Sequence, residues 1–295
     1  MFWQQMVNAV SLGALYALLA IGYTMVYGII KLINFAHGEI FMCGAFFTWW
    51  FMSALLLPFP VAALAGIFLA TLVGLGVERI AYRPLRNSPR FNVVISVLGM
   101  SIFLQNMARI VWGAENQIFD VTFDMPPIII GNVVITIKKV VILATSLVLM
   151  TALGIFVKKT YLGKAMRATA ADGEAAEMMG INANAVVVLT FAIGSAMGAV
   201  AGILFAINYN SIDPFMGFNA GLKAFTAAVL GGIGNIYGAM LGGLLLGVFE
   251  GIGAGYISSM YRDAFAFGVL ILVLIFRPEG LLGETGRFKK RKRAR

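Results

Sequence analysis

The sequence predicts an all-α fold, a polytopic transmembrane helical bundle of about eight or nine spans with Gly-interrupted segments. Of the 295 residues, 60% are hydrophobic and only 12% are charged, and the mean hydropathy is +0.91. Soluble domains carry about 25% charged residues because their surface faces water. So few charges cannot cover a water-soluble globule of this length, and the surplus apolar surface is expected to face lipid.

The candidate spans follow from long uncharged stretches. Residues 40–77, 178–212 and 224–249 contain no Asp, Glu, Lys or Arg, and about 20 apolar residues cross a membrane. The first apolar stretch, 6–30, is too long for the apolar region of a signal peptide and is expected to be a retained span. The candidate spans are 6–30, 39–57, 60–77, 92–112, 140–157, 186–207, 221–234, 236–257 and 264–276.

Basic residues gather beside these spans and predict the topology. Sixteen of the 22 Lys and Arg lie in 79–90, 158–167 and 277–295, as expected when basic loops remain in the cytoplasm. The loops 79–90 and 158–185 and the tail 277–295 are therefore expected to be cytoplasmic, and the loops 113–139 and 208–220 are expected to lie outside. The side of Met1 depends on the span count. Nucleic-acid binding is disfavoured, because no soluble domain is left to form a basic surface.

Two segments interrupt the helical pattern in the two halves of the chain, 33–39 and 230–235. Broken segments of this kind often mark a transport path near the middle of the membrane. We therefore expect a path between them, and the alternative is close helix packing through small residues. Packing is favoured for Gly238 and Gly242. The path candidates are Asn34, His37, Glu39, Gly232, Gly234, Asn235 and Glu250.

Few charges fall within the spans. A buried charge in a membrane usually pairs with a partner or faces a cavity. Glu250 is expected to be either a structural hydrogen-bond partner or a path-lining group, whereas Arg109 and Lys223 are expected near span ends, where long side chains reach the interface. No chain of acidic residues suggests a proton relay.

The residues for catalysis are missing. The sequence has one His and one Cys, Cys43, and no pair of such residues at metal-ligand spacing. Gly163-Lys164 is followed by Ala165 where a P-loop needs Ser or Thr, so the chain is not expected to bind ATP through a P-loop. We expect no enzyme activity, no metal and no cofactor bound by this chain.

The segment 163–185 predicts a short cytoplasmic helix. Ala175, Met178 and Met179 share one face by their i, i+3, i+4 spacing, and Gly180 can end the helix in a left-handed conformation. Such a methionine-bearing surface can fit a groove on another protein. The alternative is an interfacial helix that lies on lipid.

The same segment carries a family resemblance. Glu174-Ala175-Ala176-x-x-x-Gly180 resembles the EAA loop of ABC importer permeases. With it occur four further motifs, and the ordered set is similar to the LivH-type permeases of branched-chain amino acid importers over essentially the whole chain. These motifs are Ile33-Asn34-Phe35-Ala36-His37-Gly38-Glu39, Ala81-Tyr82-Arg83-Pro84-Leu85-Arg86, Leu230-Gly231-Gly232-Ile233-Gly234 and Phe276-Arg277-Pro278-Glu279-Gly280-Leu281-Leu282-Gly283.

The resemblance implies a single permease domain, residues 1–295, in a bacterial cytoplasmic membrane. It implies a homologous second permease subunit, two ABC ATPase subunits that hold ATP and Mg, and an extracytoplasmic binding protein. The ATPase-coupling residues would be Glu174, Ala175, Ala176, Met178, Met179 and Gly180. Related permeases serve urea and short amides, so the substrate stays open. A self-sufficient secondary transporter or channel and a membrane scaffold without a path are the competing classes.

Overall fold

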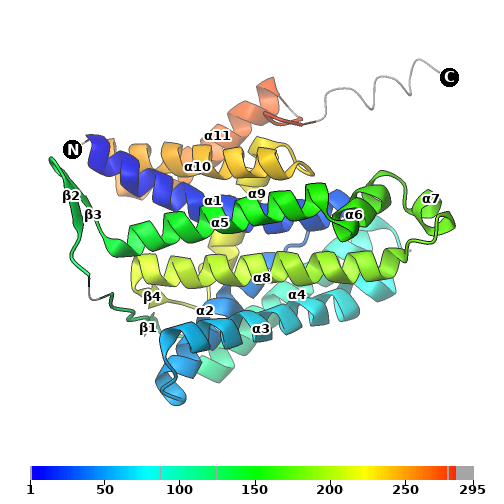
Figure 1. Cartoon of the computed structure of the whole chain (residues 1–295), viewed down its shortest axis with the longest axis horizontal. Helices are drawn as coiled ribbons and strands as arrows, with labels where there is room; N and C mark the ends of the chain where they lie inside the picture. The colour runs from blue at the N-terminus through cyan, green and yellow to red at the C-terminus, as the bar shows by residue number, and fades with distance from the viewer. Residues whose placement is uncertain (1, 87, 124, 278, 284–295) are drawn as a thin grey trace.

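Helices make up most of the chain in the computed structural model, which describes residues 2–86, 88–123, 125–277 and 279–283. Figure 1 shows the long helices running roughly side by side. The α-helices are α1 (Phe2–Ile30), α2 (His37–Ala54), α3 (Phe59–Val77), α4 (Arg90–Trp112), α5 (Ile137–Lys159), α6 (Tyr161–Ala171), α7 (Gly173–Met178), α8 (Ala183–Tyr209), α9 (Met216–Gly231), α10 (Ile236–Tyr256) and α11 (Arg262–Phe276). The shorter elements are a π-helix (Glu78–Tyr82), two 3-10 turns (Arg83–Leu85 and Ser259–Tyr261), β1 (Gln117–Ile118), β2 (Ile128–Ile130), β3 (Val133–Ile135) and β4 (Ser211–Ile212).

An all-α membrane bundle fits these helices. Within the described residues, six helices are long and apolar enough to cross a membrane. Three further helices fall on the other sequence-predicted spans: α2 has 18 residues but includes His37 and Glu39, and α9 and α11 have only 16 and 15 residues. The predicted total of eight or nine spans therefore stays a prediction. The six long segments are Phe2–Ile30, Phe59–Leu85, Arg90–Trp112, Ile137–Lys159, Ala183–Tyr209 and Ile236–Tyr256.

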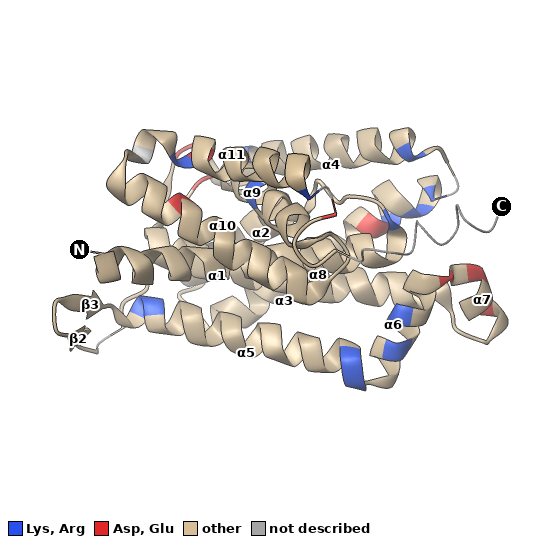
Figure 2. Ribbon diagram, turned by 90° about the horizontal axis from the view of Figure 1, so that it is seen from above, with Lys and Arg blue, Asp and Glu red and all other residues tan. Residues whose placement is uncertain are grey.

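The bundle has two chemically different ends. Figure 2 shows that Lys and Arg gather near α6 and the start of α4, whereas the β2–β3 hairpin lies at the opposite end. β1 and β4 lie with the hairpin (Figure 1) and pair antiparallel, Gln117 with Ile212. That pairing joins the two loops that the charge pattern predicted to lie on one side of the membrane.

The core lies around α1. Its most apolar 18-residue window is 94% buried, against 28%, 22% and 28% for the windows of the α3, α4 and α5 segments. α1 packs against α5, α8, α9 and α10, which enclose it within the bundle. The outer helices instead expose large apolar side chains such as Phe68 and Phe103, 64% and 56% accessible. This distribution is expected where outer helices face lipid or another apolar surface rather than water.

Small residues allow α1 and α10 to approach closely. A Cβ atom on Gly243 would lie 2.3 Å from Ala17 Cα, and one on Gly247 would lie 2.1 Å from Gly13 Cα. The same holds for Gly242 against α9, where an added Cβ would lie 2.1 Å from the Ala227 carbonyl oxygen. A Cβ on Gly238 would lie 2.4 Å from the Gly231 carbonyl oxygen, so the packing interpretation of Gly238 and Gly242 is confirmed.

Candidate functional site

The first break separates α1 from α2 and is shorter than the sequence predicted. α1 ends at Ile30 and α2 begins at His37, so His37 and Glu39 lie in the first turn of α2 rather than in the break. Lys31 leaves α1 with a φ of 59°. The Tyr82 hydroxyl, from the π-helix after α3, donates to the Ile33 carbonyl at 2.9 Å and ties the extended segment to the bundle.

The second break separates α9 from α10. α9 ends at Gly231 and α10 begins at Ile236. Gly232 and Gly234 have φ values of 105° and 97°, which side chains with a Cβ rarely adopt, so glycine is needed at both positions. Asn235 begins the next helix, because its Oδ1 accepts from the Gly238 N–H at 3.1 Å.

The two breaks lie against each other. A Cβ on Gly28, near the end of α1, would lie 3.8 Å from Gly234 Cα. Ile33 of the first break and Ile233 of the second line one cavity of about 10 Å³, which is room for about one water molecule. The remaining lining residues are Tyr23, Tyr27, Phe225 and Ala228. Segments 200 residues apart in the sequence therefore meet at one small cavity.

Polar side chains near the first break are buried with incomplete pairing. Glu39 is fully buried, and its Oε1 accepts from the Ser101 hydroxyl on α4 at 3.1 Å. Glu39 Oε2 and the side-chain amide of Asn34 have no hydrogen-bond partner among the described residues. Unpaired buried polar atoms are uncommon and call for an explanation, such as water or a ligand. These groups fit a polar site inside the bundle.

His37 fills a slot between helices. Its ring lies edge-on to the Tyr23 ring, with centroids 4.7 Å apart. A Cβ on Gly22 would lie 2.3 Å from His37 Nε2, and one on Gly198 would lie 3.2 Å from its Cε1. The imidazole therefore occupies space that only glycines on α1 and α8 leave open. The path candidates are thus split. Gly234 lies near Gly28 beside the small cavity, whereas His37 and Glu39 pack against other helices.

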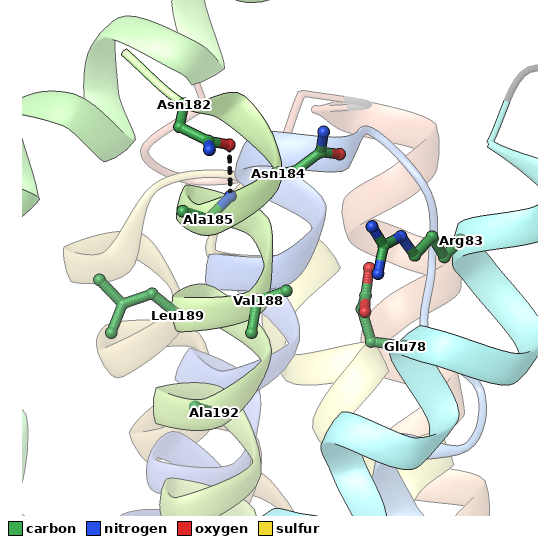
Figure 3. A pocket seen from close by; sticks show the side chains of 8 residues that line it. All are labelled: Glu78, Arg83, Asn182, Asn184, Ala185, Val188, Leu189 and Ala192. Carbon is green, nitrogen blue, oxygen red and sulfur yellow. Dashed lines mark hydrogen bonds between the residues drawn. The ribbon is translucent and has the colours of Figure 1, made fainter.

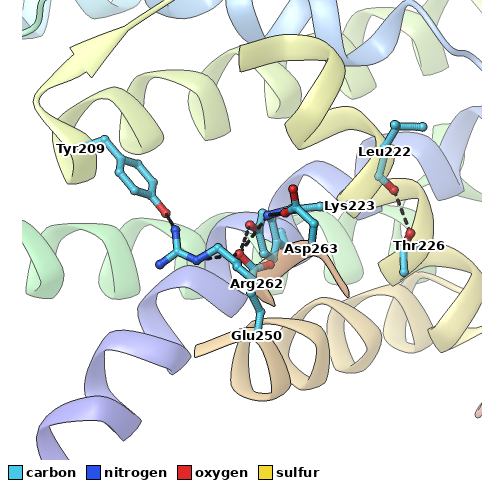
Figure 4. Close-up of polar contacts among 8 residues, drawn as sticks. Tyr209, Leu222, Lys223, Thr226, Glu250, Arg262 and Asp263 are labelled. Carbon is cyan, nitrogen blue, oxygen red and sulfur yellow. Dashed lines mark hydrogen bonds and ion pairs between the residues drawn. The ribbon is translucent and has the colours of Figure 1, made fainter. Parts of the chain in front are cut away.

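Glu250 belongs to an ionic cluster that the sequence did not predict (Figure 4). Lys223 Nζ lies 2.9 Å from Glu250 Oε1 and 2.8 Å from Asp263 Oδ1. The Tyr16 hydroxyl donates to Glu250 Oε1 at 3.1 Å, and Arg262 Nε lies 3.3 Å from the same oxygen. The cluster joins α1, α9, α10 and α11. The expectation that Lys223 reaches an interface is wrong, because its side chain is 12% exposed and turns toward these carboxylates.

Arg109 behaves as predicted for a residue near the end of a span. It lies in the last turn of α4 and is exposed. Its guanidinium lies 5.2 Å from the centre of the Phe215 ring, just before α9. Sequence reasoning missed a different charge, Glu78, which is buried and lies 3.0 Å from Arg86 Nη2.

Glu78 lines an open groove of about 410 Å³ near the start of α8 (Figure 3). Arg86 links the two sides of this region, because it also donates to the Asn184 side chain on α8. One wall is apolar and belongs to α8, and the polar residues lie toward the helix start. The lining residues are Glu78, Arg83, Asn182, Asn184, Ala185, Val188, Leu189 and Ala192.

α7 projects from the basic end of the bundle (Figures 1 and 2). Asp172 Oδ1 accepts from the Ala175 N–H at 3.1 Å and starts the helix. Gly180 follows its end with a φ of 84°, so the predicted left-handed terminator is confirmed. Met178 and Met179 are 89% and 83% exposed. Glu174, Ala175 and Glu177 are also exposed, whereas Ala176 is buried.

No group of three or more His, Cys, Asp and Glu residues is placed to hold a metal ion within the described ranges. The single Cys43 is free and buried in α2. The site consists instead of interrupted helices, buried polar groups and one projecting helix.

An all-α membrane bundle in which two helix breaks pack against each other, with buried polar groups beside one of them, is compatible with a transport permease. The sequence profile of the family described as "Branched-chain amino acid transport system / permease component" matches residues 5–274. The chain belongs to this family.

Several relatives show the same family. The chain is 47% identical to the high-affinity branched-chain amino acid transport system permease protein LivH of Salmonella typhimurium, over 96% of both chains. It is 45% identical to the corresponding BraD protein of Pseudomonas aeruginosa, again over 96% of both. The Escherichia coli LivM permease protein is 26% identical, over 95% of this chain and 70% of LivM.

One solved structure has a similar fold. It is PsaBC from Streptococcus pneumoniae in complex with Fab. The likeness covers 98% of this chain and 94% of that chain, with a TM-score of 0.51 and 10% sequence identity. At this identity the likeness concerns the fold alone.

Proposed function

We propose that this chain is the translocation subunit of an ATP-driven importer for branched-chain, hydrophobic amino acids, with eight or nine spans and Gly-interrupted segments near its path. The proposal rests on the family and on relatives at 45–47% identity whose names describe branched-chain amino acid permeases. The constriction between Ile33 and Ile233 supports a path there, because both helix breaks converge on it.

The observation that carries the coupling part of the proposal is α7. Met178, its last residue, and Met179, which follows it, are both highly exposed beyond the bundle, and methionine side chains adapt to grooves on partner proteins. Basic residues gather at the same end (Figure 2), which favours a cytoplasmic location for α7 and for the chain after α11. A cytoplasmic ATPase that closes on ATP would then pull α7 and reorient the spans.

The complex we propose contains a homologous second permease, two ABC ATPases and an extracytoplasmic amino-acid-binding protein in a bacterial cytoplasmic membrane. The relationship to LivM supports a heterodimer of two permeases. ATP and Mg would bind to the ATPases, and this subunit would be non-catalytic. The binding protein would make most of the substrate selection.

Crosslinking tests the coupling directly. In a Cys43→Ser background, Glu177→Cys should crosslink to a cysteine in a surface groove of the cognate ATPase. Gly180→Val should weaken this contact and uptake, because a β-branched residue is strained at a φ of 84°. Gly180→Asn is the matched control, because Asn tolerates the left-handed conformation and no atom lies within 4 Å of a Cβ at Gly180.

The complex reconstituted in liposomes should take up labelled leucine or isoleucine with ATP and binding protein, and should not take up labelled urea. Absence of a Glu177 crosslink, together with full uptake by Gly180→Val, would place α7 on lipid. Uptake of urea in preference to leucine would overturn the proposed substrate, and uptake without any ATPase would indicate a secondary transporter.

A further inference from the structure

The chain after the last helix returns to the second break. Figure 1 shows the end of α11 near the α9–α10 connection. The Leu281 N–H donates to the Leu230 carbonyl and the Leu282 N–H to the Gly231 carbonyl, both at 2.9 Å. Two sequence motifs that lie about fifty residues apart, 230–234 and 276–283, therefore form one structural unit.

This unit satisfies the end of α9 completely. The last four carbonyls of a helix have no partner within the helix. The Gly232 N–H donates to the first two of these carbonyls, that of Ala228 at 3.0 Å and that of Val229 at 3.2 Å. Leu281 and Leu282 supply donors to the remaining two. Without residues 281 and 282, two carbonyls at the end of α9 would lose these partners.

Glycines allow the two segments to approach this closely. A Cβ on Gly232 would lie 2.6 Å from Gly283 N, and one on Gly280 would lie 2.5 Å from Gly232 Cα. Gly280 also has a φ of 80°. The Leu281 side chain packs against the main apolar core next to these glycines. The glycines of the motif 276–283 are thus explained by their packing against the second break, between α9 and α10, and not by contacts within α11.

Asn235 joins the late segment to the start of α10. Its Oδ1 accepts from the Gly238 N–H at 3.1 Å, and its Nδ2 donates to the Leu282 carbonyl at 2.9 Å. One side chain therefore caps α10 and holds the returning segment. Ile233 and Gly234, between these anchors, are the residues that face Ile33 and Gly28.

We propose that Asn235 and residues 280–283 are positioning elements for transport: they hold the α9–α10 break against the α1–α2 break and so set the closed constriction. This inference rests on the proposed function only for its transport consequence. The returning segment, which we call the break clamp (residues 280–283), fixes Ile233 opposite Ile33, and loosening it widens the constriction without removing a group that lines it.

The substitution Asn235→Asp separates the two roles of this side chain. Aspartate keeps an oxygen that caps α10, because Asp and Asn are equally good N-cap residues, but it loses the Nδ2 donor to Leu282. Asn182→Asp is the matched control, since Asn182 caps α8 through Ala185 in the same way and has no second side-chain hydrogen bond among the described residues. A second pair of variants is truncation after Gly283, which keeps the clamp, and truncation after Glu279, which removes it.

The assay is disulfide formation between Ile33→Cys and Ile233→Cys in a Cys43→Ser background, in the full complex in membranes. We expect rapid crosslinking with the clamp intact, in Asn182→Asp and after truncation at Gly283. Asn235→Asp and truncation after Glu279 should slow it, because losing one hydrogen bond lowers the ratio of closed to open constriction about fivefold. Uptake should fall in the same two variants while membrane levels and ATPase association stay unchanged.

Equal crosslinking rates in all four variants would overturn the proposal, as would lost uptake with an unchanged crosslinking rate. The crosslinking assay does not depend on transport. If the parent complex imports no amino acid, the proposed function fails, and the crosslinking rates still decide whether the break clamp positions Ile233.

Discussion

The buried ionic cluster offers a quantitative test of how α9, α10 and α11 are held together. Glu250 is fully buried. Its Oε1 accepts a hydrogen bond from the Tyr16 hydroxyl at 3.1 Å and lies 2.9 Å from Lys223 Nζ and 3.3 Å from Arg262 Nε. The substitution Lys223→Met keeps most of the aliphatic stem but removes the charge nearest to this oxygen. Glu250 then stays in the interior with a weaker cationic partner, because Arg262 is farther away and 38% exposed.

Removal of one partner from a buried ion pair costs 3–5 kcal/mol. Because Arg262 remains, we expect the free energy of unfolding to fall by about 3 kcal/mol, at the low end of that range. Loss of the Lys223–Asp263 contact adds little, because Asp263 is 70% exposed and exposed pairs contribute about 1 kcal/mol or less. Asp263→Asn is therefore the control and should cost less than about 1 kcal/mol.

A double-mutant cycle isolates the pair. Glu250→Gln leaves Lys223 with Asp263, and the double variant Lys223→Met/Glu250→Gln removes both buried charges at once. We expect the double variant to cost less than the sum of the two single variants by about 2 kcal/mol, within the range measured for residues in contact. Unfolding titrations in mixed micelles measure all four proteins. Costs that add within about 0.5 kcal/mol would show that the two residues do not interact.

Three further outcomes follow from the packing and the two ends of the bundle. Gly243→Val should lower the free energy of unfolding by about 1–3 kcal/mol, because the added atoms overpack α1 against α10. Gly268→Ala is the control: no atom lies within 4 Å of a Cβ at this position, so thermal unfolding should change little. Met178→Ser should leave the free energy of unfolding unchanged within about 0.5 kcal/mol, because Met178 is exposed. It should reduce co-purification of the ATPase, and normal co-purification would place the contact elsewhere. In a Cys43→Ser background, an impermeant thiol reagent should label Glu115→Cys but not Lys164→Cys in intact cells, and the reverse pattern would invert the orientation.

The sequence was sufficient for the membrane bundle and for the small-residue packing. Uncharged stretches of span length locate helices because lipid requires every backbone polar group to be satisfied within the bundle. Each candidate span indeed overlaps a helix. The boundaries were less accurate: α9 begins at Met216, five residues before the predicted segment, because Gly217 and Gly221 fit against Gly38 of α2 rather than ending the helix.

The ends of the first break could not be predicted from local pattern. Asn34 to Glu39 combines polar and small residues, and such residues are compatible with a loop or with a first helical turn. Packing decides the outcome: a Cβ on Gly38 would lie 2.2 Å from the Gly217 carbonyl oxygen. Gly38 therefore packs closely against α9, and this contact favours the helical position of residue 38. The local sequence around Gly38 does not reveal that contact.

The ionic cluster and the break clamp share the same reason for escaping prediction. Lys223 in an apolar segment has the same local pattern whether it reaches lipid headgroups or a buried carboxylate, and only the approach of Glu250, 27 residues later, distinguishes the two. Asn235 likewise reads as an N-cap, which it is, but the partner of its second polar atom is Leu282. In both cases the local sequence identifies one residue of the pair, whereas its partner lies far away in the sequence and cannot be identified from it.

The two pairings have a common geometric consequence. Charged residues at the start of α11 tie it to α9 and α10, and backbone hydrogen bonds tie the residues after α11 to the α9–α10 break. α11, which has only one buried residue of its own, Ala266, is thereby held at both ends. The glycines that follow it allow the chain to approach Gly232 at the α9–α10 break.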